Sequence, residues 1–96
     1  MTNQSFEWDQ EKNATNQKDH GVAFEEAQYA FFDENRIIAH DEKHSHKEER
    51  WFCIGKVGDR IVTVRFTYRS DTIRIFGAGC WRKWSKYDEE ENSEHR

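Results

Sequence analysis

The chain lacks several features that membrane-bound, secreted or redox proteins depend on. Its 96 residues contain no proline, no internal repeat and only two cysteines, which are not in CxxC spacing. This spacing gives little support for a metal or redox site, and no apolar run approaches the roughly 18 residues of a membrane span. The first eight residues lack the basic start and apolar core of a signal peptide. We therefore expect one cytoplasmic domain, with no membrane segment, in which Cys53 and Cys80 are reduced thiols.

Apolar residues are also scarce, at 34% of the chain, whereas charged residues reach 35%. Aromatic residues make up 15% of the chain, so four Trp, seven Phe and three Tyr must supply much of the buried area. A chain of this length buries somewhat over half of the surface that its unfolded form exposes. The predicted core is therefore adequate but thin.

Positive and negative charges are separated along the chain. Residues 50–87 carry nine lysines and arginines against two acids, whereas residues 1–49 carry five against twelve. Residues 88–96 hold five acids and one arginine, so the net charge of −4 conceals a basic segment. A basic segment with interleaved aromatics is typical of proteins that bind a polyanion, because lysine and arginine release counterions from phosphates.

Two helices are predicted in the N-terminal half, over residues 10–19 and 23–33. Asp9 can cap the first, because its side chain can accept a hydrogen bond from a free N–H of the first turn. His20-Gly21 is the expected end of that helix, since glycine readily adopts positive φ. The second helix shows apolar residues at helical spacing from Phe24 onward.

Strand signals dominate the remainder. Strands are predicted over residues 36–39, 51–56, 60–69 and 72–76. The third alternates apolar and polar residues, and the short turns between the last three favour an antiparallel meander with one buried face. Gly77-Ala78-Gly79 is expected to end the sheet, and residues 81–87 to form a short basic helix.

The predicted fold class is α+β, with two N-terminal helices packed on a curled antiparallel sheet of about four strands and a short C-terminal helix. A single domain over residues 1–96 is expected, with flexible ends at 1–5 and 88–96.

One side of the third predicted strand is rich in cations. Period-2 geometry places Arg65, Thr67 and Arg69 on the same side. Arg74 joins them if the polar face of its strand is the same one, and Arg50 is a candidate fourth member. Neighbouring guanidinium groups repel one another, so the set needs either acidic partners within the fold or a phosphate ligand. We favour the phosphate ligand, with pairing to the acidic N-terminal half as the alternative.

Several motifs together resemble the BrnT toxin family over residues 6–87. They are FEWD at residues 6–9, HGVxFEEA at residues 20–27 and HSxxEER at residues 44–50, where x is any residue. Single residues that fit the same order and spacing are Lys12, Asn16, Trp51, Ile54, Gly55, Thr67, Arg69, Ile73, Arg74 and Ile75.

The resemblance implies the toxin half of a type II toxin–antitoxin pair. Such a toxin is a metal-independent ribonuclease with a RelE-like fold and no cofactor, and it blocks translation. Its implied partners are RNA and a BrnA-type antitoxin with a ribbon-helix-helix DNA-binding segment. The toxin would reach operator DNA only through that antitoxin.

Three positions depart from the family's pattern. Many relatives have lysine where Asp19 stands, serine where Ala23 stands, and Ser-Ala-Arg where this chain has Gly77-Ala78-Gly79. The missing arginine motivates a second hypothesis, a catalytically weakened member that retains antitoxin binding and operon co-repression. A plain RNA-binding module is the third.

Cleavage of RNA without a metal ion needs a base for the 2′-hydroxyl, an acid for the leaving 5′-oxygen and cations for the pentavalent phosphate. The candidate catalytic residues are His20, Glu49, Arg50, Arg69 and Arg74. The candidate RNA-binding residues are Lys12, Arg65, Arg82, Lys83 and Tyr87. The structural alternatives are a helix-capping hydrogen bond for His20, a salt bridge for Glu49, a core position for Tyr87 and a solvent-facing position for Lys12.

Three histidines, His40, His44 and His46, lie within a charged loop whose spacing matches no zinc motif. We therefore predict no metal site, and expect His44-Ser45 to order the loop that leads into Arg50.

The tryptophans have two interpretations. Trp51, Trp81 and Trp84 are candidate base-stacking platforms, and equally candidate anchors for an antitoxin, because tryptophan is enriched at binding hot spots.

Overall fold

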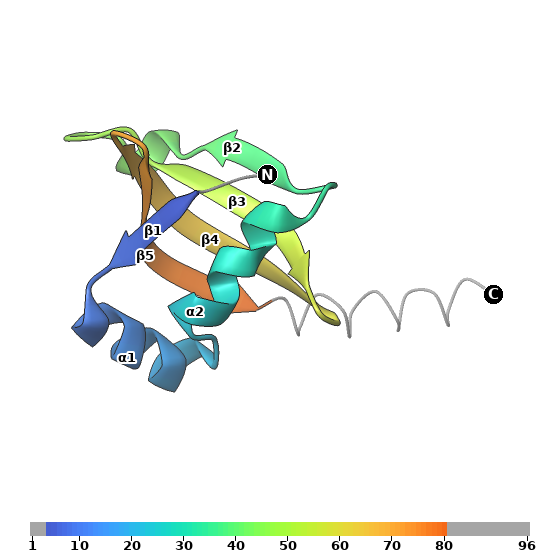
Figure 1. Cartoon of the computed structure of the whole chain (residues 1–96). Helices are drawn as coiled ribbons and strands as arrows, with labels where there is room; N and C mark the ends of the chain where they lie inside the picture. The colour runs from blue at the N-terminus through green and yellow to red at the C-terminus, as the bar shows by residue number, and fades with distance from the viewer. Residues whose placement is uncertain (1–3, 81–96) are drawn as a thin grey trace.

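The computed structural model describes residues 4–80, which form a five-stranded sheet with helices packed against it (Figure 1). The elements are β1 Ser5–Trp8, α1 Gln10–His20, α2 Phe24–Ala27, the 3-10 helix η1 Gln28–Phe32, β2 Ile37–His40, the 3-10 helix η2 Glu42–His44, β3 Trp51–Val57, β4 Arg60–Arg69 and β5 Thr72–Cys80. The strand order is β1-β5-β4-β3-β2. The predicted α+β class is confirmed.

The prediction of an antiparallel sheet of about four strands is wrong in one respect, because β1 adds a fifth strand. It pairs in parallel with β5, from Ser5 opposite Thr72 to Trp8 opposite Ile75. The other three pairings are antiparallel. Four residues directly before a helix cap are too few for a strand signal, and their partner lies at the other end of the chain.

The first helix follows the prediction closely. Asp9 Oδ1 accepts hydrogen bonds from the backbone N–H of Glu11 at 2.8 Å and of Lys12 at 3.3 Å. Gly21 ends the helix with φ of 71°, and its N–H donates to the carbonyl oxygen of Gln17 at 2.9 Å. The cap residue and the stop residue thus perform the roles that their chemistry indicated.

Two buried asparagines attach this polar helix to the rest of the fold. Asn16 Nδ2 donates to the carbonyl oxygens of Val22 and Ala78, both at 2.9 Å, and its Oδ1 accepts from the Ala78 N–H at 3.2 Å. Asn13 Oδ1 accepts from the Phe24 N–H at 2.8 Å. The helix is therefore held against β5 mainly by amide hydrogen bonds rather than by an apolar stripe.

The continuous helix predicted over residues 23–33 is wrong, because α2 ends at Ala27 and the chain continues as η1. The change in winding accompanies a close approach of η1 to β3. A Cβ atom built at Gly55 would lie 2.3 Å from the carbonyl oxygen of Ala30. Ala27, Ala30 and Phe31 are all buried against the sheet.

The core lies between these helices and the near face of the sheet. The inward residues of β4, Val62, Val64 and Phe66, are fully buried, as their alternation predicted. The rings of Phe31 and Phe66 meet edge to face with centroids 4.9 Å apart, a favoured aromatic geometry.

The prediction that Gly77-Ala78-Gly79 ends the sheet is wrong, since β5 extends to Cys80. Gly77 pairs with Arg65 and Gly79 with Thr63, so both glycines lie within the β4–β5 ladder. The predicted C-terminal helix over residues 81–87 and most of the predicted flexible ends lie outside the described residues. Among residues 4–80, no helix is long and apolar enough to cross a membrane.

Candidate functional site at the end of α1

The sheet face that turns away from α2 and η1, here called the outer face, carries the predicted arginines. On β4 the side chains of Arg65, Thr67 and Arg69 alternate with inward apolar residues. Arg74 of β5 pairs with Thr67, so it belongs to the same face. Arg50 directly precedes β3 and lies beside this row. The four arginines of the predicted set therefore share one face of the sheet.

A bulge in β5 brings an aromatic ring into the middle of the outer face. Arg65 pairs with Gly77 while Phe66 pairs with Ile75, which leaves Phe76 without a partner on β4. A bulged residue locally redirects its side chain, and Phe76 is turned toward α1, where it lines a hollow with α1 residues.

Two cations lie against the Phe76 ring. Arg50 Cζ is 4.2 Å and Lys12 Nζ is 5.7 Å from the ring centroid. Both distances are within the range of cation–π attraction. The ring therefore brings Lys12 of α1 and Arg50 of the β3 entry to one place.

Two hollows meet at the C-terminal end of α1. The helix hollow, of about 330 Å³, is lined by Glu11, Lys12, Thr15, Asn16, Asp19, His20 and Phe76. The sheet hollow, of about 270 Å³, is lined by Asn16, His20, Phe52, Thr63, Arg65, Ala78 and Gly79. Two residues, Asn16 and His20, line both. The sheet hollow has no carboxylate in its lining, so it is the better site for a phosphate.

The guanidinium of Arg65 lies in contact range of Gly77 on β5. A Cβ atom at Gly77 would lie 3.4 Å from Nη2 and 3.5 Å from Nε of Arg65. The guanidinium thus extends over the β5 backbone toward α1. Within residues 4–80, no carboxylate lies within ion-pair distance of Arg65.

The other three arginines of the outer face are paired with carboxylates. Arg74 Nη1 lies 3.2 Å from Glu7 Oε2. Glu48 Oε2 lies 3.4 Å from Arg69 Nη2 and 3.8 Å from Arg50 Nη2. Pairing to the N-terminal half therefore holds for these three, whereas Arg65 keeps its charge available to a ligand.

His20 does not form the helix-capping hydrogen bond that was the alternative to a catalytic role. The Gly21 N–H satisfies the carbonyl of Gln17 instead. The His20 ring is exposed, and in the described part of the chain it makes no hydrogen bond. The side chain lines both hollows and has no protein partner among residues 4–80.

Glu49 does not join His20. Its carboxylate forms a short ion pair with His40 Nε2 at the β2–β3 edge, while its carbonyl oxygen accepts from Thr67 Oγ1 at 2.5 Å. The salt bridge that we considered as the alternative for Glu49 is thus the arrangement observed.

The loop before Arg50 is ordered as predicted for His44-Ser45. His44 Nδ1 lies 2.9 Å from the buried Asp41 carboxylate. Ser45 Oγ donates to the Asp41 carbonyl oxygen at 2.7 Å and accepts from the Arg50 N–H at 2.9 Å. Among residues 4–80, no group of three His, Cys, Asp or Glu side chains could hold a metal ion.

The pKa shifts of Cys53 and Asp33 have structural causes outside both hollows. Burial raises the pKa of the Cys53 thiol to about 12, which makes it an inert core residue. Hydrogen bonds from the backbone N–H groups of Asn35 and Lys56 lower the pKa of the Asp33 carboxyl.

Three predicted RNA-binding residues, Arg82, Lys83 and Tyr87, lie outside the described residues, as do Trp81 and Trp84. Two residues of the site escaped the sequence reasoning as functional groups. The bulge at Phe76 has one local signal, an aromatic residue directly before a glycine within a strand. Phe52 was expected only as part of a strand.

The chain matches a known protein family. No curated protein matches the chain. The family described as "Ribonuclease toxin, BrnT, of type II toxin-antitoxin system" matches residues 8–88, a range that includes every residue of both hollows. The chain therefore belongs to the BrnT family of ribonuclease toxins of type II toxin–antitoxin systems.

Proposed function

We propose that this chain is an active endoribonuclease toxin that cleaves RNA in the sheet hollow without a metal ion. The observation that carries the proposal is the meeting of His20 and Arg65, one able to transfer a proton and the other cationic, in a hollow without carboxylates. Both side chains lack a protein partner among residues 4–80, whereas the neighbouring arginines are paired.

In this mechanism the neutral His20 imidazole accepts the proton of the ribose 2′-hydroxyl. The 2′-oxygen attacks the adjacent phosphorus, and the bond to the 5′-oxygen breaks. The products are a 2′,3′-cyclic phosphate and a 5′-hydroxyl, whose proton comes from solvent. Arg65 stabilises the charge of the pentavalent phosphate, and such a contact typically contributes about 2–4 kcal/mol to transition-state stabilisation.

Other residues of the site bind the RNA. Lys12 and Arg50, both beside Phe76, would contact a phosphate next to the cleaved one. Phe52 in the wall of the sheet hollow offers a ring on which a base can stack.

The test is incubation of the purified, antitoxin-free chain with total RNA in excess EDTA, followed by analysis of the product ends. We expect cleavage that leaves cyclic phosphate ends and that falls about 100-fold in His20→Ala and in Arg65→Ala. Arg60→Ala is the matched control, because Arg60 pairs with Glu26 away from both hollows. Cleavage that requires a divalent metal, or that is unchanged in both variants, would overturn this assignment.

A second candidate function has its own observation. Gly79 faces the sheet hollow, and nothing lies within 4 Å of a Cβ atom built there. Relatives that resemble this chain often have arginine at this position, so the hollow lacks one cation. A weakened member that acts mainly through its antitoxin would show no cleavage, and Gly79→Arg would then restore it.

The proposal includes a BrnA-type antitoxin and a cytoplasmic site of action. The family supports a protein antitoxin as partner. Growth arrest and loss of protein synthesis on expression, relieved by coexpression of the antitoxin, are the expected results. A toxin that reaches DNA only through the antitoxin would not shift operator DNA alone and would do so in the complex.

A further inference from the structure

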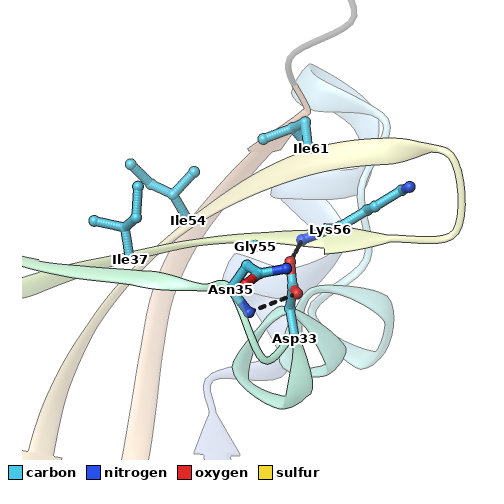
Figure 2. A pocket seen from close by; sticks show the side chains of 7 residues that line it. All are labelled: Asp33, Asn35, Ile37, Ile54, Gly55, Lys56 and Ile61. Carbon is cyan, nitrogen blue, oxygen red and sulfur yellow. Dashed lines mark hydrogen bonds between the residues drawn. The ribbon is translucent and has the colours of Figure 1, made fainter.

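The outer face has an apolar end that the ribonuclease site does not use. Three isoleucines from adjacent strands, Ile37, Ile54 and Ile61, point to the same side (Figure 2). We call them the isoleucine strip. They line a hollow of about 500 Å³, and Ile37 is 58% exposed.

The carboxylate at the edge of this hollow already has hydrogen-bond partners. Asp33 accepts from the Asn35 N–H at 3.0 Å and from the Lys56 N–H at 2.7 Å (Figure 2). The strip therefore suits an apolar ligand such as an aromatic side chain, rather than a small polar molecule.

The chain leaves the described structure beside this strip. Cys80 pairs with Val62, which directly follows Ile61 on β4, and Gly79 pairs with Thr63. Gly79 lines the sheet hollow on the outer face, and Cys80 packs against the core. Trp81 and Trp84 follow in the sequence.

The sequence that follows contains a run of charge opposite to that of Arg65. Residues 88–91 read Asp-Glu-Glu-Glu, and Glu94 follows. The seven residues between Cys80 and this acidic run span at most about 25 Å. Thr63, which pairs with both Ile54 and Gly79, joins the strip to the sheet hollow. Acids carried past the strip can therefore reach the hollow of His20 and Arg65.

We propose that Trp81 and Trp84 dock on the isoleucine strip and that the acidic run 88–94 occupies the RNA-binding hollow as an intramolecular competitor of RNA. The second half of the proposal rests on the proposed function of that hollow, whereas the docking of the tryptophans does not. Carboxylates held near Arg65 replace phosphates at a high effective concentration. RNA must then displace the segment before it can be cleaved.

Docking is tested first by fluorescence, independently of RNA. The difference in emission between the full chain and its Trp81→Ser/Trp84→Ser variant isolates these two indoles. We expect Ile37→Asp to shift this difference to the red and to increase its quenching by acrylamide. Tyr29→Asp is the matched control, because Tyr29 is 57% exposed on the other side of the sheet. A difference spectrum unchanged by Ile37→Asp would overturn the proposal.

Competition is tested with a 2′-O-methyl RNA oligonucleotide, which the proposed mechanism cannot cleave. Glu89→Gln/Glu90→Gln/Glu91→Gln is expected to tighten binding roughly tenfold at low salt, and less at high salt. The exposed acids Glu34, Glu42 and Asp59 provide a control variant with the same change in net charge. Equal tightening by both variants would show a general charge effect and contradict the proposal.

The failures of the two proposals are distinguishable. If no variant binds RNA, the proposed function fails, while the fluorescence still decides whether the tryptophans dock. If Ile37→Asp leaves the indole emission unchanged but prevents formation of the antitoxin complex, the strip belongs to the antitoxin and the proposed docking is wrong.

Discussion

The two faces of the sheet differ in whether their side chains have partners. On the helix-covered face, apolar side chains from β3, β4 and β5 pack against α2 and η1, as in the edge-to-face contact of Phe31 with Phe66. On the outer face, Arg65 and His20 have no protein partner among residues 4–80, and the isoleucine strip is exposed. The helix-covered face accounts for the fold, whereas the outer face presents side chains that are available to bind other molecules.

The largest expected effect is on stability, in a comparison of two variants that each add one methyl group to one face of the sheet. Gly55→Ala places a Cβ atom 2.3 Å from the Ala30 carbonyl oxygen, so we expect a loss of about 3 kcal/mol in the free energy of unfolding. Gly79→Ala on the outer face meets nothing within 4 Å, and should change stability by less than about 0.5 kcal/mol. Urea denaturation of both variants measures the difference. Similar losses in the two would contradict the contrast between the faces.

Within the outer face, the comparison is between an unpaired and a paired arginine. Arg65→Ala is expected to lower kcat/KM for RNA cleavage about 100-fold, because it removes a cation from the phosphate site. Arg69→Ala removes a guanidinium that Glu48 already neutralises, so we expect a change of less than about fivefold. Steady-state cleavage of a fluorogenic RNA measures both, and a larger loss in Arg69→Ala would mean that the phosphate binds at the other end of the row.

Asn16 joins the two regions, since it holds α1 to β5 and lines both hollows. Asn16→Ala leaves the buried Ala78 backbone without its partners, which should lower the free energy of unfolding by about 2 kcal/mol. Because α1 carries His20, cleavage should also fall at temperatures where the variant is fully folded. Thermal denaturation and cleavage at 15 °C separate the two effects. Unchanged cleavage by a destabilised variant would show that α1 does not position His20.

The smallest expected effect is on the reactivity of Cys53, which is buried on the helix-covered face. In a Cys80→Ser background, the Cys53 thiol should react with a thiol reagent at pH 8 only as fast as the chain unfolds. The raised pKa of about 12 keeps the thiol protonated at that pH, and burial blocks access. The rate should therefore rise in urea, and fast labelling in native buffer would show that the core is not closed over β3.

The sequence predicted the parts of the fold that depend on local chemistry. The cap at Asp9, the stop at Gly21 and the alternation of Arg60–Arg69 were all found where expected. The parallel strand β1 was missed because its partner lies 67 residues away. The break between α2 and η1 accompanies a close approach to Gly55, which no local pattern indicates.

The sequence predicted most of the residues of the site, but not which of them lie together. His20, Lys12, Arg50 and Arg65 come together, but Glu49 is held by His40, and Arg69 and Arg74 are paired with carboxylates. Residue type indicated which side chains could act on a phosphate. The bulge at Phe76 helps to decide which of them meet, and it depends on pairing between strands.

The central claim, that His20 and Arg65 act on the same phosphate, is tested most directly by a double-mutant cycle on RNA cleavage in EDTA. The rates of the chain, His20→Ala, Arg65→Ala and the double variant are compared at one pH. If both residues act at one transition state, the double variant should be little slower than the slower single variant. Losses that multiply fully, or single variants as fast as the unchanged chain, would contradict it.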